Sequence, residues 1–220
     1  MHCDIWHLKV KRAQYAKFCY ENKNKMFNLP LQPRYILPPL CLMALSALLA
    51  ALNLNDVLEF NRQLIEQGQV WRLITSQYVH ANWPHLALNC AGIILIWALH
   101  AEHTKPAQYA LHTLFLAAWC GIGIYYFCPD IRIYTGLSAL LHGVIVWGAI
   151  KDIEAGMKTG VLLFIGIWLK IGYEQFHGPS AEVGKLIASR VAIDAHLIGA
   201  IGGIVLALPV FITYIKKRQV

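Results

Sequence analysis

Six long apolar runs constrain this chain more than any other feature of its sequence. Each run is bounded by charged residues, proline or glycine. A membrane-spanning helix needs about 20 apolar residues, and about 17–25 are workable. All six runs reach that range, the fifth only just. We therefore expect six transmembrane helices, at roughly residues 35–52, 84–101, 107–128, 133–150, 160–176 and 191–215.

The overall composition agrees with a membrane protein. Of the 220 residues, 57% are hydrophobic and only 14% are charged, whereas soluble domains carry roughly 25% charged residues. Six spans fill a chain of this length and leave no room for a large soluble domain. The sequence predicts an all-α integral membrane protein, with a basic segment over residues 1–34 and a six-helix membrane domain over residues 35–220.

The distribution of basic residues predicts the orientation in the membrane. Seven of the 19 Lys and Arg precede the first apolar run, and Lys216, Lys217 and Arg218 follow the last one. Basic residues beside apolar spans gather on the cytoplasmic face, so both termini are expected there. The segments 53–83, 129–132 and 177–190 then lie outside, and 13 of the 19 Lys and Arg lie inside.

The same distribution argues against a nucleic-acid partner, despite the formal net charge of +7. Basic and aromatic residues do not alternate in a way that suggests base stacking. The basic segment 1–34 is too polar to insert and is expected on the anionic lipid of the inner surface. It has no signal-peptide cleavage site. Whether translation starts at Met1 or at Met26 stays open.

The six cysteines show no metal-site pairing such as C-x-x-C, and most fall inside apolar runs. There they behave as small hydrophobic residues. We expect neither a disulfide framework nor a metal or other cofactor. The sequence says nothing about the oligomeric state.

The outer segment 53–83 is unusually long for a connection in a helical bundle. We expect it to be partly helical and amphipathic around residues 57–65. The pair Trp71-Arg72 follows. An arginine beside a tryptophan at a membrane interface can fix such a segment by donating hydrogen bonds to backbone carbonyls.

Four polar residues lie inside the predicted spans near their outer ends. Ser138 and His196 each lie about five residues into the fourth and the sixth span, while His85 opens the second span and Asn89 follows one turn later. A strongly polar side chain in the bilayer is costly unless it is satisfied, so it points to a functional site. We expect these four side chains to lie at similar depth.

Small residues predict a close approach between the helices that carry this pair. Ala195, Gly199 and Gly203 recur every four residues beside His196, and Ala139 and Gly143 repeat that spacing beside the serine. A small-xxx-small stripe lets two helix backbones come together. A hydrogen bond between the hydroxyl and the imidazole requires such a short separation.

Several of these motifs together resemble the rhomboid family of intramembrane serine proteases. The resemblance rests on Trp71-Arg72, on the spacing His80-x4-His85-x3-Asn89, on Gly136-Leu137-Ser138 and on Ala195-His196-x-x-Gly199-x-x-x-Gly203. The stretches Tyr134–Gly143 and Arg190–His196 are most similar to the bacterial rhombosortase branch, whose members are proposed to cut C-terminal GlyGly-CTERM sorting tails from exported proteins.

This resemblance implies roles for the residues. Ser138 would be the nucleophile and His196 its base, with His85, Asn89 and the Ser138 backbone N–H forming the oxyanion hole. Transmembrane proteins would be the substrates, and the site would face the periplasm from the bacterial inner membrane. One departure is Ala139, where the family has glycine; its methyl group could narrow the space for the substrate or change the flexibility of the loop.

Other ionisable residues leave alternatives open. His142 lies four residues after Ser138 on the same helix face and is a rival base. Asp194 is expected to pair with Arg190 at the i,i+4 spacing rather than to orient the base. His80 is expected to fix a loop, and the histidines on the cytoplasmic side to be bystanders: His100, His103 and His112.

Three other functions compete with the protease. An inactive rhomboid-like protein that binds membrane clients would be expected to lack the serine or the histidine. A metal site could use four histidines, but no carboxylate is placed to complete it: His80, His85, His142 and His196. A proton-coupled transporter would favour internal repeats, and none is found. Candidate gating elements are the fifth span and the segment 177–190.

Overall fold

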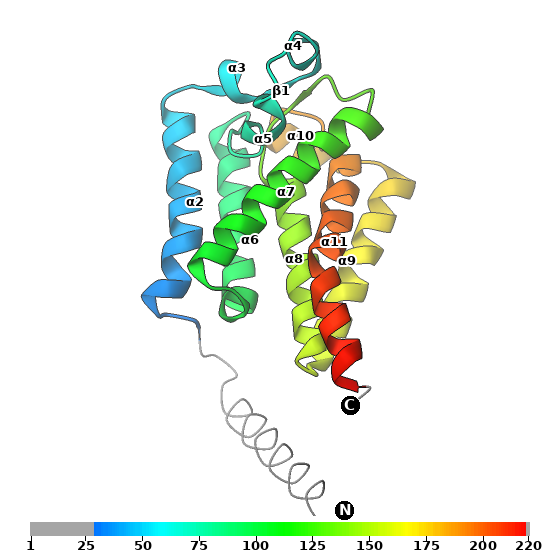
Figure 1. Cartoon of the computed structure of the whole chain (residues 1–220). Helices are drawn as coiled ribbons and strands as arrows, with labels where there is room; N and C mark the ends of the chain where they lie inside the picture. Colours follow the sequence, from blue (N-terminus) through cyan, green and yellow to red (C-terminus); the bar gives the residue numbers. More distant parts are fainter. Residues whose placement is uncertain (1–28, 219–220) are drawn as a thin grey trace, which may run out of the picture. The chain divides into compact units, whose positions relative to one another are not determined.

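The computed structural model describes residues 29–218, so most of the basic segment predicted at 1–34, and the question of a start at Met26, lie outside the described residues. The compact unit Leu31–Val220 is an assembly of helices with one short β-ribbon (Figure 1). Six long helices lie side by side in it, in the order predicted from the apolar runs: α2 (Pro33–Ala51), α6 (Trp83–His100), α7 (Pro106–Phe127), α8 (Ser138–Glu154), α9 (Lys158–His177) and α11 (Ile193–Arg218).

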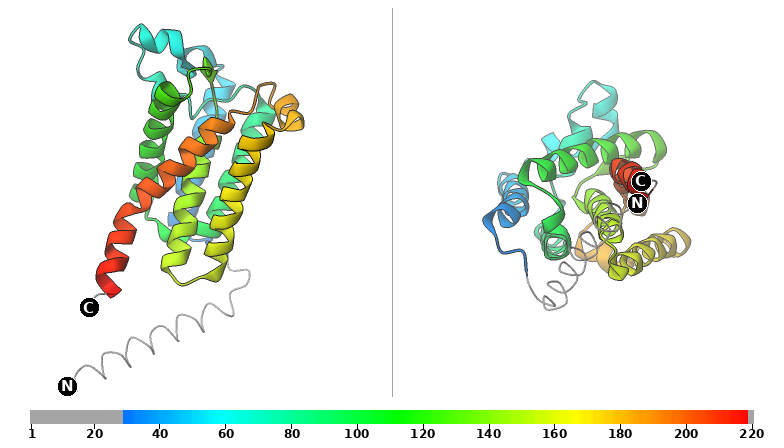
Figure 2. Two further views of the ribbon diagram at one scale, coloured as in Figure 1. Left: turned by 90° about the vertical axis from the view of Figure 1, so that its right-hand side faces the viewer. Right: turned by 60° about the horizontal axis from the view of Figure 1, so that its bottom comes forward.

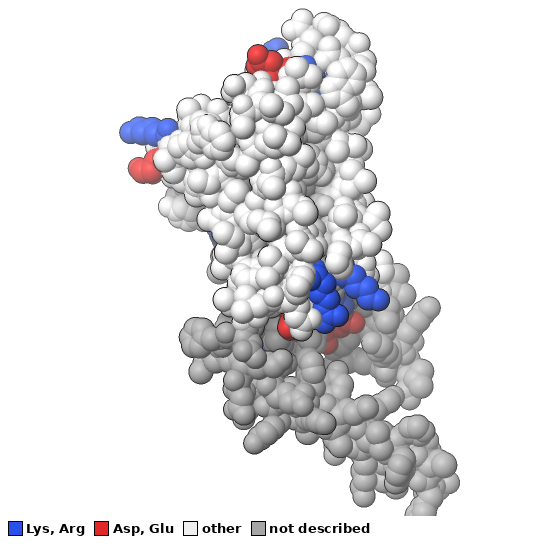
Figure 3. All heavy atoms as spheres, turned by 90° about the vertical axis from the view of Figure 1, so that its left-hand side faces the viewer, with Lys and Arg blue, Asp and Glu red and all other residues white. Residues whose placement is uncertain are grey.

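Three helical segments among the described residues are long and apolar enough to cross a membrane: Pro33–Ala51, Trp83–His103 and Pro106–Phe127. Ile193–Pro209 is a shorter apolar helix. On the face drawn in Figure 3, the charged side chains lie toward the two ends, with a nearly uncharged band between them. The all-α membrane fold is therefore confirmed, while the crossing of the membrane by all six helices stays a prediction.

Local sequence explains where these helices begin and end. Proline stands in the first turn of α2, α6 and α7, where its missing N–H costs no hydrogen bond. The side chain of Asn82 caps α6 by accepting a hydrogen bond from the His85 N–H at 2.8 Å. Gly178, with a φ of 84°, ends α9 in a conformation that glycine adopts without strain.

The outer segment folds into short pieces rather than one amphipathic helix. It contains α3 (Asn55–Leu58), α4 (Arg62–Glu66) and α5 (Arg72–Thr75). Between the first two, β1 (Phe60–Asn61) pairs antiparallel with β2 (Ile133–Tyr134). The helix expected around residues 57–65 is therefore interrupted, because the backbone of Phe60 pairs with that of Tyr134 in the segment before α8.

Two arginines fix this outer segment. Arg72 is buried and donates to the carbonyls of Glu59 at 2.9 Å and Asp56 at 2.8 Å, so the predicted anchoring by arginine is confirmed. The Trp71 indole N–H donates to the Val57 carbonyl at 3.3 Å. Arg62, which was not singled out in the sequence, donates to four carbonyls of the α7 end and the following turn: Ile124, Tyr125, Cys128 and Ile131.

Helices α8 and α11 approach each other backbone to backbone, as the stripe of small residues predicted. A Cβ on Gly199 would overlap the Ala139 carbonyl, and one on Gly203 would overlap the Gly143 carbonyl. No side chain other than hydrogen fits at either glycine without moving a helix. The contact lies in the first two turns of α8, and the two helices diverge toward the C-terminal end of α11, as the turned view shows (Figure 2). The remaining short elements are η1 (Ala101–His103) and α10 (Ala181–Leu186).

Candidate active site

Ser138 is the first residue of α8, so the expectation that it lies about five residues into the helix is wrong. The preceding residues are extended or turned, because Tyr134 belongs to β2 and Gly136 has a φ of 116°. The Tyr134 hydroxyl donates to the Gly136 carbonyl at 2.8 Å and accepts from the Ala139 N–H at 3.4 Å. This bridge holds the backbone on both sides of the serine.

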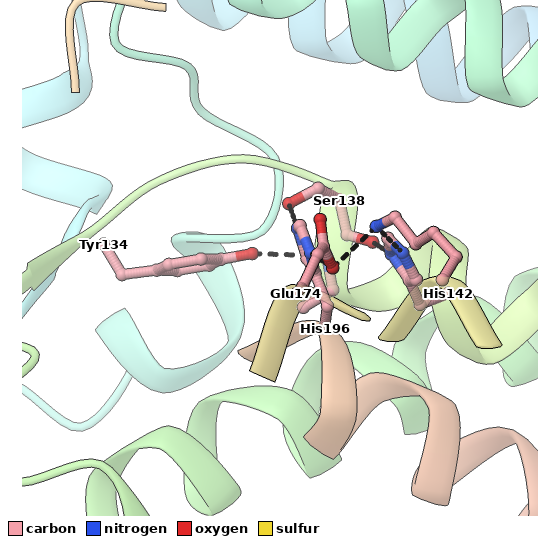
Figure 4. A network of polar contacts seen from close by, with 7 residues as sticks. Tyr134, Ser138, His142, Glu174 and His196 are labelled. Atoms are coloured by element: carbon pink, nitrogen blue, oxygen red, sulfur yellow. Dashed lines mark hydrogen bonds and ion pairs between the residues drawn. The ribbon is translucent and has the colours of Figure 1, made fainter. Parts of the chain in front are cut away.

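His196 is the fourth residue of α11 and also lies in the first turn, slightly nearer the helix start than expected. Its Nε2 lies 3.2 Å from the Ser138 Oγ (Figure 4). The imidazole is 5% exposed. The structure therefore brings together the hydroxyl of α8 and the imidazole of α11, at the crossing where the two backbones touch.

A carboxylate that sequence reasoning missed lies on the other side of this imidazole. The Oε2 of Glu174, in the last turns of α9, lies 3.2 Å from the Nδ1 of His196. The same oxygen is 2.8 Å from the Nζ of Lys170, one turn earlier. The available signal was a Lys–Glu pair at the i,i+4 spacing inside the fifth apolar run, where ionisable residues are rare.

His142 lies against this group but does not contact the serine hydroxyl. Its Nδ1 is 2.7 Å from the backbone oxygen of Ser138, and its Nε2 is 2.9 Å from the Nζ of Lys170. Its ring stacks on that of His196, with centroids 4.2 Å apart and planes at 14°. Both nitrogens of His142 therefore have partners other than the hydroxyl for which it was considered a rival base.

His85 and Asn89, both buried on α6, lie beside the turn that precedes the serine. A Cβ built on Gly136 would lie 2.6 Å from the His85 Nε2 and 3.4 Å from the Asn89 Nδ2. The Asn89 amide nitrogen is buried without a hydrogen-bond partner among the described residues. It is thus a donor available for an atom that enters the site.

His80 packs edge-on against His85, with ring centroids 5.1 Å apart. Burial lowers its pKa from 6.5 to about 3, and the neighbouring His85 contributes in the same direction. His80 is therefore neutral at ordinary pH, and its place between the outer segment and α6 fits the loop-fixing role expected from the sequence.

Asp194 takes no part in the group around His196. The described residues include no ion pair between Asp194 and Arg190, so that expectation was wrong: Arg190 precedes α11 and lies off the helical i,i+4 geometry.

At the other end of the bundle, Asp152 contacts His103 at 2.6 Å and His100 at 3.3 Å, far along α8 from the serine.

The expectation that no carboxylate accompanies the histidines also needs correction. His142, Glu174 and His196 each offer a ligand atom, and these atoms lie within 4.8 Å of one another. The Lys170 ammonium, however, contacts both His142 and Glu174. A cation bound by this set would have to displace that positive charge.

Ala139, the departure from the family pattern, is fully buried in an apolar cluster with Phe60, Ala195 and other residues. Its methyl group thus packs into the core between α8 and α11.

Comparison with known proteins agrees with this fold, which is that of a helical membrane protein. The model of the rhomboid domain matches residues 67–213, which span every element of the site. The chain belongs to the rhomboid family. It is also 25% identical over 162 residues, or 70% of its length and 73% of the relative, to a Bacillus subtilis (strain 168) protein described as "Putative rhomboid protease YdcA".

Proposed function

We propose that this chain is an intramembrane serine protease in which Ser138 and His196 form the catalytic pair. The observation that carries the proposal is the 3.2 Å separation between the Ser138 Oγ, which is half-buried, and the Nε2 of the buried His196. Nucleophilic catalysis by a serine needs a base within hydrogen-bond reach of the hydroxyl. Membership of the rhomboid family supports the same reaction.

The reaction proceeds by acyl transfer. The His196 Nε2 takes the proton of the Ser138 hydroxyl while Oγ attacks the scissile carbonyl carbon. The resulting imidazolium gives that proton to the leaving amine, the peptide C–N bond breaks, and an acyl-enzyme remains. Water, activated by the same imidazole, then attacks the acyl carbon and releases the carboxylic acid product.

The negative oxygen of the tetrahedral intermediate needs donors. The Ser138 backbone N–H, the Asn89 amide and the His85 ring are the groups we assign to it. Ser138 begins α8, and the first N–H groups of a helix are oriented toward an anion at its N-terminus. Loss of one oxyanion donor typically raises the barrier by about 2.7–4 kcal/mol.

The substrates we propose are transmembrane proteins, specifically exported proteins that carry a C-terminal GlyGly-CTERM sorting tail. The Bacillus subtilis relative is itself described as a "Putative rhomboid protease". Both termini would be cytoplasmic in a bacterial inner membrane, so the site at the outer ends of α6, α8, α9 and α11 would face the periplasm.

The test is labelling with a serine-reactive fluorophosphonate, combined with cleavage of a co-expressed tail-bearing membrane reporter. We expect the wild type to be labelled and to cleave, and both Ser138→Ala and His196→Ala to lose cleavage while still inserting in the membrane. Ser189→Ala and His177→Ala remove the same groups at exposed positions. Neither side chain hydrogen-bonds to Ser138 or His196, so these variants are the matched controls and should retain both signals.

Each outcome separates the alternatives. Cleavage that persists in Ser138→Ala or His196→Ala refutes the catalytic pair. Specific retention of the reporter by a wild type that neither labels nor cleaves would instead favour the inactive client-binding protein.

A further inference from the structure

Among the residues that the structure describes, Glu174 is the carboxylate that contacts the catalytic pair, and the Ser–His reaction described above makes no use of it. The Glu174 side chain is only 16% exposed, whereas its ion-pair partner Lys170, on the same apolar helix, is 47% exposed. A glutamate that served only as the partner of Lys170 could lie outward beside it. Instead it reaches across from α9 to His196 on α11 (Figure 4).

The contacts of His196 define which nitrogen carries its proton. The Nδ1 faces a carboxylate oxygen, which can only accept a hydrogen bond when it is ionised. The Nδ1 therefore carries the proton and donates a hydrogen bond to the Glu174 carboxylate. The Nε2 is left with its lone pair directed at the Ser138 hydroxyl, which is the tautomer that a base needs.

The neighbouring contacts keep the imidazole in one orientation. Lys170 donates to the Nε2 of His142 at 2.9 Å, so the His142 Nδ1 carries a proton and donates to the Ser138 carbonyl at 2.7 Å. The ring of His142 in turn covers one face of the His196 ring. His196 is thus held at both ring nitrogens and on one face.

We propose that Glu174 is a positioning residue that orients His196, so that the working unit is a Ser138–His196–Glu174 triad supplied by α8, α11 and α9. This inference rests on the proposed protease function. When the serine proton moves to Nε2, the carboxylate also stabilises the imidazolium that forms, as in soluble serine hydrolases, without itself taking the proton.

Two other roles could explain the same contacts. Glu174 could form a structural ion pair with Lys170 that fastens α9, or it could be a ligand of a divalent cation together with His142 and His196. The triad differs from both because it acts on the rate of the chemical step alone. It requires the negative charge to face the Nδ1 of His196, and it requires neither the ammonium nor a metal.

The experiment measures kcat and KM for cleavage of a transmembrane reporter by the purified full-length protein in proteoliposomes. Glu174→Gln keeps the size of the side chain and removes its charge. We expect it to lower kcat about 10- to 100-fold with KM changed less than about twofold. The loss is smaller than the roughly 10⁴-fold seen in a soluble triad, because Lys170 already shares the charge.

Three further variants separate the roles. Glu174→Asp restores the carboxylate on a shorter side chain. Its kcat should be at least several-fold higher than that of Glu174→Gln. Glu66→Gln, the same change at an exposed glutamate at the end of α4, should leave kcat unchanged. Lys170→Met removes the ion pair but leaves the carboxylate on His196, and should cost less than Glu174→Gln.

The proposal is overturned if Glu174→Gln turns over at the wild-type rate while Ser138→Ala is inactive; this outcome leaves the protease function intact. Equal losses in Lys170→Met and Glu174→Gln, with matching drops in the thermal unfolding midpoint, would assign a structural ion pair. Inactivation of the wild type by EDTA and its recovery with Zn²⁺ would assign a metal site. Cleavage by Ser138→Ala would overturn both the protease pair and the triad.

Discussion

The first and last outer connections of this protein differ sharply in how they are held. The first, between α2 and α6, is fixed by Arg72 and Arg62, whose guanidinium groups together donate to six backbone carbonyls. The last, between α9 and α11, is exposed along most of its length apart from the buried Ile187 and Val191. One side-chain hydrogen bond, from Asn82 to the Leu186 carbonyl at 3.1 Å, links it to the start of α6.

Because of this difference, the part of the site next to the first connection is held rigidly, and the α9–α11 side is free to move. Ser138 begins α8, directly after the β2 strand that pairs with β1 of the first connection, and His85 and Asn89 lie in the first two turns of α6, which follows that connection. Glu174 and His196 lie at the two ends of the last connection. We therefore expect opening motions to occur on the α9–α11 side, in agreement with the gating elements suggested by the sequence, and amides 181–190 to exchange hydrogen faster than amides 60–75.

The strongest challenge to this comparison is Arg72→Ala. The substitution removes two hydrogen bonds from a buried charged group to carbonyls, each worth about 1.5–3 kcal/mol, so the free energy of unfolding should fall by about 3–6 kcal/mol. Thermal unfolding in detergent measures this loss. Arg132→Ala, an exposed arginine in the turn before β2, is the control and should unfold like the wild type; an equally small effect of Arg72→Ala would show that the first connection is not held as described.

A second test uses two glycines. A Cβ on Gly121 of α7 would overlap the backbone carbonyl of Leu73 in α5, while one on Gly172 of α9 meets no atom within 4 Å. Gly121→Ala should destabilise the protein by about 1–3 kcal/mol through overpacking. Gly172→Ala should be neutral or slightly stabilising, since alanine favours helix. The same unfolding assay compares them, and similar midpoints for both variants would contradict the close packing of α5 on α7.

A third test uses pH. The pKa of His80 lies near 3 in the folded protein, below the 6.5 of an unfolded chain, because the side chain is buried. As the pH falls, His80 is therefore protonated in the unfolded chain before it is protonated in the folded protein. The free energy of unfolding falls as the pH drops below about 6.5. Between pH 6.5 and 5.5 the fall from this residue is about 1 kcal/mol. His80→Asn should lessen the acid shift of the unfolding midpoint, whereas His177→Asn, at an exposed position, should not.

The smallest expected effect tests the mobility of the α9–α11 connection. Asn82→Ser keeps a residue that can cap α6 but is too short to reach the Leu186 carbonyl. The lost hydrogen bond is worth about 0.5–1.5 kcal/mol. Hydrogen exchange of amides 181–190 should accelerate by several-fold while exchange in 60–75 is unchanged. Acceleration in both segments, or in neither, would mean that the two connections are not independent.

The sequence predicted the elements of this fold that depend on composition and spacing. The six apolar runs correspond to the six long helices, the Trp71-Arg72 anchor bonds to carbonyls, and the stripe at Gly199 and Gly203 marks a backbone contact. The start of α8 could not be read in the same way. It depends on the pairing of Tyr134 with Phe60, more than 70 residues earlier, and no local pattern reports such a distant partner.

The same limit applies to the site. The meeting of Ser138 and His196 could be predicted, because each lies beside a small-residue stripe that brings α8 and α11 together. Glu174 was missed because its role depends on the rotation of α9 about its own axis, which decides whether the side chain faces lipid or His196. The ion pair expected between Asp194 and Arg190 was wrong for a related reason: the helix begins three residues after the arginine.

The contact of α8 and α11 through glycine has a consequence for which substitutions the sequence can accept during evolution. The spacing between the hydroxyl and the imidazole is set by main-chain atoms touching main-chain atoms, so the bulk of the surrounding apolar side chains does not enter into it. Lipid-facing leucines, isoleucines and phenylalanines should be exchangeable in large numbers without disturbing that spacing. A mutational scan should therefore find wide tolerance over most of the surface and near-complete intolerance at Gly199 and Gly203.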